Sequence, residues 1–260
     1  MDLETGQVTD IMGASETILN FENVIASENN DTVYGTDETN EINTLDGDDN
    51  IYARGGDDII QISLGNHLID GGGGADTVDF SSINVGAHID LIAGLVTKSD
   101  TTSDILIGVE NIIGTHADDT IIGDDNDNRL HGAEGNDFIV GGEGFDTAVF
   151  QGDIDGYAID FVRGTVTDID AADGDYGTDT LVSIELLNFA NDDTISYPVD
   201  ILLGVETLSE AVIDAHQVDV VELLGDVVEG NSYAKLFFYC LYCKTVSYTH
   251  LRAHETPEHR

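Results

Sequence analysis

The sequence is poor in positive charge: its 260 residues include 8 Lys and Arg against 52 Asp and Glu, a formal net charge of −44. This deficit excludes a nucleic-acid-binding protein, which needs a basic surface, and disfavours attraction to anionic membranes. No apolar run approaches the ~18 residues of a membrane-spanning helix, so we expect no membrane span. Proline is also scarce, with 2 residues against 29 glycines. That pairing indicates tight turns repeated many times, and the 41% of hydrophobic residues argues against disorder.

Basic residues and cysteines are concentrated at the end of the chain. The last 26 residues contain four of the eight bases, two acids and both cysteines. Within them, residues 246–256 read V-S-Y-T-H-L-R-A-H-E-T, which resembles a translated sequencing adapter. We therefore expect residues 233–260 to be a non-native tail that takes no part in the fold.

Nonapeptide repeats occupy two blocks, residues 26–79 and 114–149. The first block has six units, from ASENNDTVY to GGGGADTVD, and the second has four, from GTHADDTII to GGEGFDTAV. The eighth position is apolar in all ten units, which chance would produce roughly once in 10^4 trials. The sixth position is Asp in seven units and the fourth is Gly in six. The nine-residue register is therefore a real property of the sequence.

These positions predict one sharp turn and one short strand in each unit. Glycine permits the positive φ of a turn, and the tripeptide around the eighth position predicts a strand with one inward side chain. Because a single unit buries too little surface to be stable, the units must stack into a parallel solenoid with two units per turn. Sixth-position carboxylates of units i and i+2 then face the same gap and repel each other unless a cation separates them. Carboxylate and carbonyl oxygens suit Ca²⁺.

Two units match the pattern G-G-x-G-x-D-x-U-x, where U is apolar: GGGGADTVD at 71–79 and GGEGFDTAV at 141–149. They resemble the haemolysin-type calcium-binding repeat of the RTX family. The resemblance implies an all-β fold, a parallel β-roll with Ca²⁺ between successive loops. It also implies an extracellular or cell-surface protein that leaves the cell through a type I secretion system.

The stacking rule predicts which side chains share a calcium ion. Pairs of two aspartates should bind best, and these are Asp31/Asp49, Asp58/Asp76 and Asp119/Asp137. The pairs Asn40/Asp58 and Asn128/Asp146 lack one charge and should bind more weakly, and His67 beside Asp49 should give a poor site. The candidate calcium-binding residues are Asp31, Asp49, Asp58, Asp76, Asp119, Asp137, Asp146, Asn40, Asn128, Gly71, Gly73, Gly132 and Gly141.

A larger repeat surrounds the nonapeptides. The start of the chain matches the region between the blocks at a constant offset of 88 residues, and G-T-D-T-L-V-S-I-E-L-L at 177–187 resembles residues 104–110. Because the chain opens inside such a unit, we expect it to be a piece of a larger protein. The expected division is 1–25 as the end of a β-rich insert, 26–79 as a first calcium-binding roll, 80–113 as a β-rich insert, 114–149 as a second roll, 150–200 as a β-rich cap and 201–232 without assignment.

No catalytic motif such as H-E-x-x-H, G-x-S-x-G or a phosphate-binding loop occurs in the sequence. We therefore expect a non-enzymatic calcium-binding module that folds on binding extracellular calcium and supports the secretion and stability of a larger protein. Its partners would be calcium ions, a type I secretion system and other domains of the parent protein. The alternative is the C-terminal part of an RTX exoenzyme of the protease, lipase or alginate-epimerase kind, or of an RTX adhesin, with the active domain outside this chain.

Overall fold

A computed structural model describes residues 1–9, 15–17, 22–160, 162–170, 177–189 and 196–198. The chain divides into the units Met1–Leu203 and Gly204–Arg260, and the second unit lies wholly outside the described residues. The unassigned segment from residue 201 to 232 and the expected tail also lie outside them. Within the described residues, no helix is long and apolar enough to cross a membrane.

Each nonapeptide ends in a short strand whose middle residue is buried. All ten eighth-position side chains are at most 1% exposed, as the repeat pattern predicts. The strands of the first block are β4 (Thr32–Tyr34), β5 (Glu41–Asn43), β6 (Asn50–Tyr52), β7 (Ile59–Gln61), β8 (Leu68–Asp70) and β9 (Thr77–Asp79). Those of the second are β14 (Thr120–Ile122), β15 (Arg129–His131), β16 (Phe138–Val140) and β17 (Thr147–Phe150).

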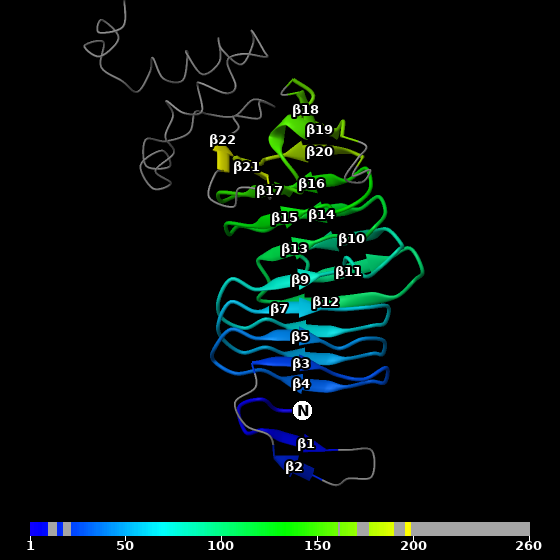
Figure 1. The fold of residues 1–260 in the computed structure, drawn as a ribbon, viewed down its shortest axis with the longest axis vertical. Coiled ribbons are helices and arrows are strands. Elements are labelled where there is room, and N and C mark those ends of the chain that lie inside the picture. Colours follow the sequence, from blue (N-terminus) through cyan, green and yellow to red (C-terminus); the bar gives the residue numbers. More distant parts are fainter. Residues whose placement is uncertain (10–14, 18–21, 161, 171–176, 190–195, 199–260) are drawn as a thin grey trace, which may run out of the picture. The chain divides into compact units, whose positions relative to one another are not determined.

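Successive strands alternate between two sheets, so that residues 18 positions apart pair in parallel. In one sheet Val33 pairs with Ile51, and Ile51 pairs with Ile69. The strands therefore lie above one another like rungs, and the buried residues form a single core between the two sheets (Figure 1). The predicted parallel β-roll, with two nonapeptides per turn, is confirmed.

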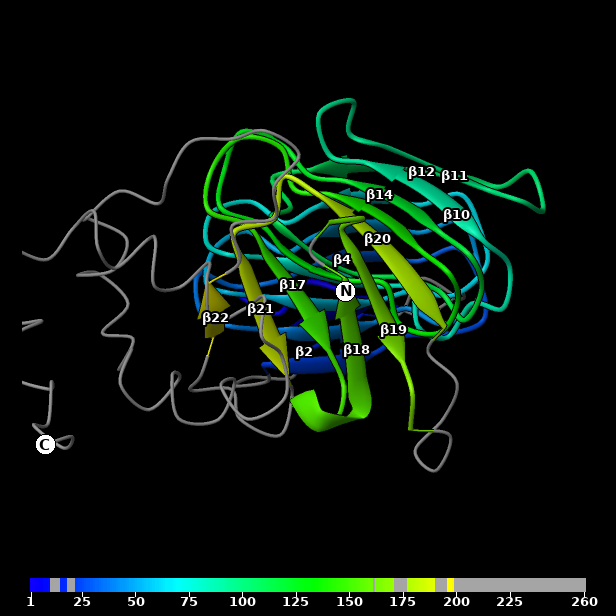
Figure 2. The ribbon, with the colours of Figure 1, turned by 90° about the horizontal axis from the view of Figure 1, so that it is seen from above.

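The stretch between the repeat blocks forms an antiparallel meander built into the roll. Its strands β10 (Ala87–Asp90), β11 (Leu95–Lys98) and β12 (Ser103–Ile107) pair in antiparallel order. At its two edges, β12 pairs in parallel with β8 and β10 pairs in parallel with β14. In the other sheet, β13 (Asn111–Ile113) lies directly between β9 and β15. Both sheets therefore pass through the expected insert, and the two blocks form one continuous roll from which the meander turns project (Figure 2).

A second meander follows the second block. It begins after a short 3₁₀ turn, η1 (Ile154–Gly156), and consists of β18 (Tyr157–Asp160), β19 (Thr165–Asp168) and β20 (Thr178–Val182). Its last strand, β20, pairs in parallel with β16, as β12 does with β8. In the other sheet, β21 (Leu186–Phe189) pairs with β17 and with β22 (Ser196–Pro198). Among the described residues, the two sheets contain eleven and nine strands.

The 88-residue repeat of the sequence is also a repeat of the structure. The strands β1 (Gln7–Thr9), β2 (Ser15–Thr17) and β3 (Asn23–Ile25) lie 88 residues before the matching parts of β11, β12 and β13. Asp2 bridges to Tyr34 in parallel as Asp90 pairs with Ile122. The turns before β1 and β11 use the same left-handed glycine, with φ of 66° at Gly6 and 63° at Gly94.

Candidate metal sites between stacked loops

The sixth-position side chains form ladders of hydrogen bonds along the roll. In each rung, the Oδ1 atom of one sixth residue accepts the backbone N–H of the sixth residue 18 positions earlier, at 2.6–2.9 Å. The stacked pairs are Asp31/Asp49, Asn40/Asp58, Asp58/Asp76, Asp119/Asp137 and Asn128/Asp146. The structure thus brings together every pair that the repeat spacing places in one gap.

The second carboxylate oxygen has no partner in many of these rungs. Within the described part of the chain, a buried Oδ2 atom without a hydrogen bond occurs at Asp49, Asp58, Asp76, Asp137 and Asp146. These five side chains belong to residues that are at most 2% exposed. A buried, unpartnered carboxylate oxygen is costly, because it has lost its hydration and gained nothing in return. Oxygen atoms in this state fit a hard oxygen-binding cation such as Ca²⁺.

The first glycine of a repeat keeps space open in front of this oxygen. A Cβ atom on Gly71 would lie closer than 3.0 Å to both Asp76 Oδ2 and the Gly108 carbonyl oxygen, and one on Gly141 would meet Asp146 Oδ2 and the carbonyl of Ser183. Gly132 faces Asp137 Oδ2 in the same way. Carboxylate and carbonyl oxygens therefore converge where a side chain would otherwise lie. Gly73 differs: a Cβ atom there would meet nothing closer than 4.0 Å, and its carbonyl oxygen accepts the N–H of Gly56 at 3.0 Å.

Burial raises the pKa of these carboxyl groups. It raises the pKa of Asp58 and of Asp146 to about 7, with neighbouring carboxylates adding to the shift. Burial and the nearby Asp119 carboxylate likewise raise the pKa of Asp137 to about 7. Burial and, to a smaller extent, the Glu110 charge raise the pKa of Asp76 to about 6. Near neutral pH each group thus needs a proton or a cation.

The backbone at the second position divides the loops other than that of His67 into two kinds. In the loops that we call open, the second residue has a positive φ and the sixth-position Oδ2 has no donor. Their second residues are Leu45, Arg54, Gly72, Ala133 and Gly142, with φ between 61° and 120°. In the closed loops, the second-position N–H instead donates to the sixth side chain at 2.6–2.9 Å.

The closed loops are the first two loops of each repeat block. Their sixth residues are Asp31 and Asn40 in the first block and Asp119 and Asn128 in the second. All four were predicted to bind calcium from their position in the repeat. The structure places them in the ladders, but one side-chain oxygen of each already accepts a hydrogen bond within its own loop. The predicted residues therefore differ in how ready their oxygens are to receive a cation.

His67 interrupts one ladder. Its Nε2 atom lies 3.1 Å from the Ser63 carbonyl oxygen, and its Nδ1 atom lies 3.4 Å from both the backbone nitrogen and Oδ2 of Asp49. If Nε2 carries the proton and donates to Ser63, Nδ1 is an acceptor and offers nothing to the Asp49 carboxylate. The imidazole thus fills the place of a carboxylate without supplying an anionic ligand.

The ladders continue beyond the nonapeptides through four acidic residues that were not predicted as site residues. Asp104 Oδ1 accepts the N–H of His67, and Asp179 Oδ1 accepts that of Asp137, both at 2.9 Å. In the other ladder, carboxylates of Glu110 and Glu185 accept the next N–H groups, also at 2.9 Å. The sequence signal for all four was the resemblance between residues 104–110 and 177–187. The nine-residue spacing could not identify these four residues, because they fall outside its register.

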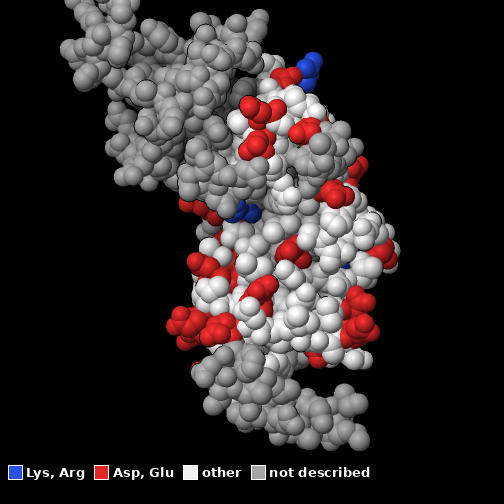
Figure 3. Space-filling view, viewed as in Figure 1, with Lys and Arg blue, Asp and Glu red and all other residues white. Residues whose placement is uncertain are grey.

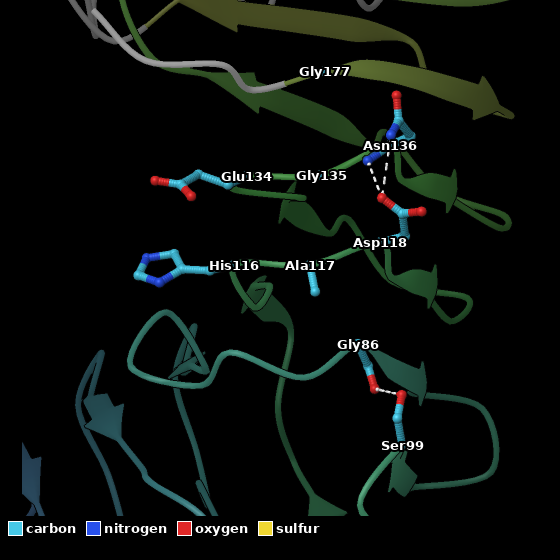
Figure 4. A pocket seen from close by; sticks show the side chains of 9 residues that line it. All are labelled: Gly86, Ser99, His116, Ala117, Asp118, Glu134, Gly135, Asn136 and Gly177. Carbon is cyan, nitrogen blue, oxygen red and sulfur yellow. Dashed lines mark hydrogen bonds between the residues drawn. The ribbon is translucent and has the colours of Figure 1, made fainter.

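A second ladder runs outside the first, along the fifth positions. Asp118 Oδ1 accepts both the backbone N–H and the side-chain amide of Asn136, which lies one turn further along (Figure 4). These residues line an open groove of about 570 Å³ over the stacked loops. Asp118 is exposed, and hydrogen bonds from Asn136 lower the pKa of its carboxyl group. Asp118 therefore stays ionised in contact with water, unlike the buried inner ladder.

Side chains alone do not make a complete metal site here. In the described residues, no group of three or more His, Cys, Asp and Glu side chains could hold a metal ion. A cation between two loops would therefore need backbone carbonyl oxygens in addition to the stacked carboxylates, which is a donor set that Ca²⁺ accepts.

Comparison with known families agrees with this geometry. A model of the RTX calcium-binding nonapeptide repeat matches four copies, at residues 25–60, 63–82 and 113–148.

The chain contains RTX calcium-binding nonapeptide repeats. It is a calcium-binding repeat module, and the matched segments contain all ten nonapeptides almost completely. No curated protein matches the chain. Figure 3 shows many Asp and Glu side chains on the surface, so the buried inner ladders account for only part of the negative charge.

Proposed function

We propose that this RTX roll is a calcium-dependent folding module of a larger secreted or cell-surface protein. The observation that carries the proposal is the set of five buried Oδ2 atoms without a hydrogen bond among the described residues. We assign the calcium ions first to the five open loops, whose aspartates are Asp49, Asp58, Asp76, Asp137 and Asp146. The remaining candidates, Asp31, Asn40, Asp119 and Asn128, contribute as the stacked neighbours of these aspartates.

Calcium binding would then supply folding free energy. Without a cation, folding buries carboxyl groups that are ionised in the unfolded chain near neutral pH, and this opposes folding. A ligand that binds only the folded state adds about 2.7 kcal/mol per site when its concentration is 100 times the dissociation constant. Several such sites together are comparable with the stability of a typical domain, about 5–15 kcal/mol, so calcium can decide whether the roll folds.

This coupling suits export. In a compartment with little calcium, the acidic chain would stay unfolded and able to pass through a type I secretion system. Calcium outside the cell would then fold it in place. We propose the segments 26–79 and 114–149 as the calcium-binding parts and 150–200 as the region that covers the end of the roll. Calcium ions, the secretion system and other domains of the parent protein are the proposed partners.

Circular dichroism and urea denaturation of the full chain test the proposal, with excess chelator, with Mg²⁺ and with Ca²⁺. We expect chelator to weaken the β-sheet signal and to lower the denaturation midpoint, and Ca²⁺ to restore both far better than Mg²⁺, which demands a smaller octahedral site. An unchanged β-sheet signal and an unchanged denaturation midpoint after chelation would refute it.

The 88-residue structural repeat favours an adhesin over an exoenzyme as the parent protein. The pairing of Asp2 with Tyr34 repeats that of Asp90 with Ile122, so the meander and the roll recur as one unit. Such a unit can extend a surface protein by simple repetition. The RTX repeat itself is typically a non-catalytic module. Electron microscopy of the full-length parent would decide: an extended array of such units supports the adhesin, and a single roll attached to a compact domain overturns it.

A further inference from the structure

The two meanders end in equivalent strands. In the first, backbone N–H groups of residues 103 and 105 donate to Asn66 and His67, and Asp104 accepts the N–H of His67. In the second, the N–H groups of residues 178 and 180 donate to Asn136 and Asp137, and Asp179 accepts the N–H of Asp137. The matching distances agree within 0.2 Å. Asp104 and Asp179 therefore hold the same place at the end of a ladder.

The first of these aspartates has a cation of its own. The Lys98 ammonium lies 2.5 Å from Asp104 Oδ2, and both side chains are completely buried. Two strands of the same meander supply the pair, since Lys98 ends β11 and Asp104 lies in β12. The buried carboxylate is thus neutralised inside the protein, at a place where the ladder would otherwise present an unpaired negative charge.

Among the described residues, no lysine or arginine forms an ion pair with the second aspartate. Strand pairing puts Asp168 where the first meander has Lys98. In the first meander, the residue that pairs with Asp104 is Val96, which precedes Lys98 by two positions. In the second, the residue that pairs with Asp179 is Val166, which precedes Asp168 by two positions. In place of an ammonium, Asp179 has the Asp137 carboxylate as a charged neighbour. Burial and this charge raise the pKa of Asp179 to about 8, and the Asp179 Oδ1 accepts the Asp137 N–H at 2.9 Å. Both residues are at most 4% exposed, and within the described chain Asp137 Oδ2 has no hydrogen bond.

Asp179 also lies in a segment whose sequence follows the repeat pattern. Residues 174–182 read G-D-Y-G-T-D-T-L-V and fit G-x-x-G-x-D-x-U-x, although the family match ends at residue 148. Gly177 has a φ of +79°, as the fourth-position Gly135 has one of +130°, and a Cβ atom on Gly177 would collide with the Gly135 carbonyl oxygen. Leu181 pairs with Ile139, eighth position to eighth position. The tripeptide from Gly177 to Asp179 therefore stacks as the second half of an eleventh nonapeptide loop.

We propose that Asp137 and Asp179 hold a calcium ion in the second meander, and that the Lys98 ammonium takes the place of such an ion in the first. The inference rests on the proposed function, because it assumes that the roll binds calcium. It adds a site outside the recognised repeats and identifies Lys98 as the residue that makes the matching site independent of calcium. Two neighbouring buried carboxylates need a proton or a divalent cation to offset their repulsion, and oxygen ligands with flexible geometry select Ca²⁺.

Counting bound calcium on full-length variants by equilibrium dialysis tests the inference. We expect Asp179→Asn to bind one ion fewer than the wild type, and Asp104→Asn to bind the same number. We also expect Asp168→Lys to lose one ion, because a lysine at the Lys98 position can supply the ammonium. A wild-type count in Asp179→Asn would overturn the site while leaving the proposed function intact. A wild type that binds no calcium would instead overturn the proposed function.

Urea denaturation separates the role of Lys98 from a loss of folding. Lys98→Met leaves Asp104 buried without its cation and should lower the denaturation midpoint equally with calcium and with chelator. The double variant Lys98→Met/Asp104→Leu removes both charges and should recover most of that loss, with the calcium count unchanged. A Lys98→Met variant whose midpoint falls only in calcium would overturn the assignment of Lys98 as a replacement for the ion.

Discussion

Replacing Asp58 by asparagine should change stability in opposite directions with and without calcium. Asp58 is completely buried, its Oδ1 accepts the Asn40 N–H at 2.6 Å, and its Oδ2 has no donor among the described residues. The adjacent Asp57 is exposed and accepts the N–H of Ala75 at 2.9 Å. Asp57→Asn therefore removes the same charge one residue away and serves as the matched control.

In calcium-free buffer at pH 8, Asp58→Asn should stabilise the roll. Burial raises the pKa of Asp58 from 3.8 to about 7, so the ionised form is disfavoured in the folded state. At about 1.4 kcal/mol per pKa unit, the penalty has a ceiling of about 4 kcal/mol. Relaxation and the weaker hydrogen bond of a neutral amide reduce the gain to roughly 1–3 kcal/mol. The fold accepts an amide here, because Asn40 and Asn128 already occupy sixth positions.

In saturating calcium, the same substitution should destabilise the roll. A site at about 1,000 times its dissociation constant adds about 4.1 kcal/mol to the free energy of unfolding, and a neutral ligand forfeits most of this. Subtracting the gain of roughly 1–3 kcal/mol that the variant has without calcium leaves an expected net loss of about 1–3 kcal/mol. Urea denaturation followed by circular dichroism, in chelator and in calcium, measures both values. Equal destabilisation by Asp58→Asn in the two buffers, or the same reversal in Asp57→Asn, would refute the reasoning.

Three further predictions follow from the loops and the core. The pKa values of about 7 at the buried aspartates exceed the unfolded value of 3.8, so the folded calcium-free roll holds protons that the unfolded chain releases. Its free energy of unfolding, measured in chelator, should therefore fall as pH rises from about 4 to about 7; a rise would contradict the burial of these groups. Gly71→Ala should cost about 1–3 kcal/mol and weaken calcium binding in a calcium titration, because its Cβ would meet Asp76 Oδ2. Gly73→Ala in the same unit should change stability by less than about 0.5 kcal/mol. Ile60→Ala should lower the free energy of unfolding, measured by urea denaturation, by about 2–5 kcal/mol. Alanine at its exposed neighbour Ile59 should lower it by less than about 1 kcal/mol. Equal losses would contradict the assignment of Ile60 to the core.

The nine-residue period predicted the parts of this structure that depend on one residue per rung. Each eighth position has to be apolar for the roll to have a core, so burial of Ile42 or Leu130 follows from the sequence alone. The sixth-position pairs followed for the same reason, since two units per turn fix which loops meet. Both features are set by spacing, and spacing can be read from a sequence.

Features that depend on tertiary context were beyond prediction. The meander 80–113 breaks the period, yet parallel pairing of β12 with β8 and of β13 with β9 carries both sheets across it. Such pairing joins segments whose separation is not a multiple of nine. The Lys98–Asp104 pair could not be predicted either, because only the fold of the meander brings the two side chains together.

The backbone conformation at the second position of the repeat was hard to predict, although it determines whether the second-position N–H reaches the sixth side chain. Glycine at positions 72 and 142 signals a left-handed backbone, but Leu45, Arg54 and Ala133 adopt the same conformation without that signal. A bulky residue with positive φ is held there by its surroundings, in this case by the stacked loops on either side. Sequence reasoning ranks the loops by the charge of the sixth residue, whereas the φ of the second residue separates the loops that have an unpartnered Oδ2 from those that do not.

The open loops carry two costs that calcium would offset together. A residue other than glycine in the left-handed region destabilises the fold by about 1 kcal/mol, and this applies to Leu45, Arg54 and Ala133. In each of these loops the aspartate also has a buried oxygen without a hydrogen bond. If the second-position peptide turned its N–H toward the aspartate, as in the closed loops, both costs would fall. We therefore expect a cation in the place of that N–H to favour the open conformation. Calcium removal should consequently close or unfold these loops first, while the closed loops at the start of each block retain their own hydrogen bonds.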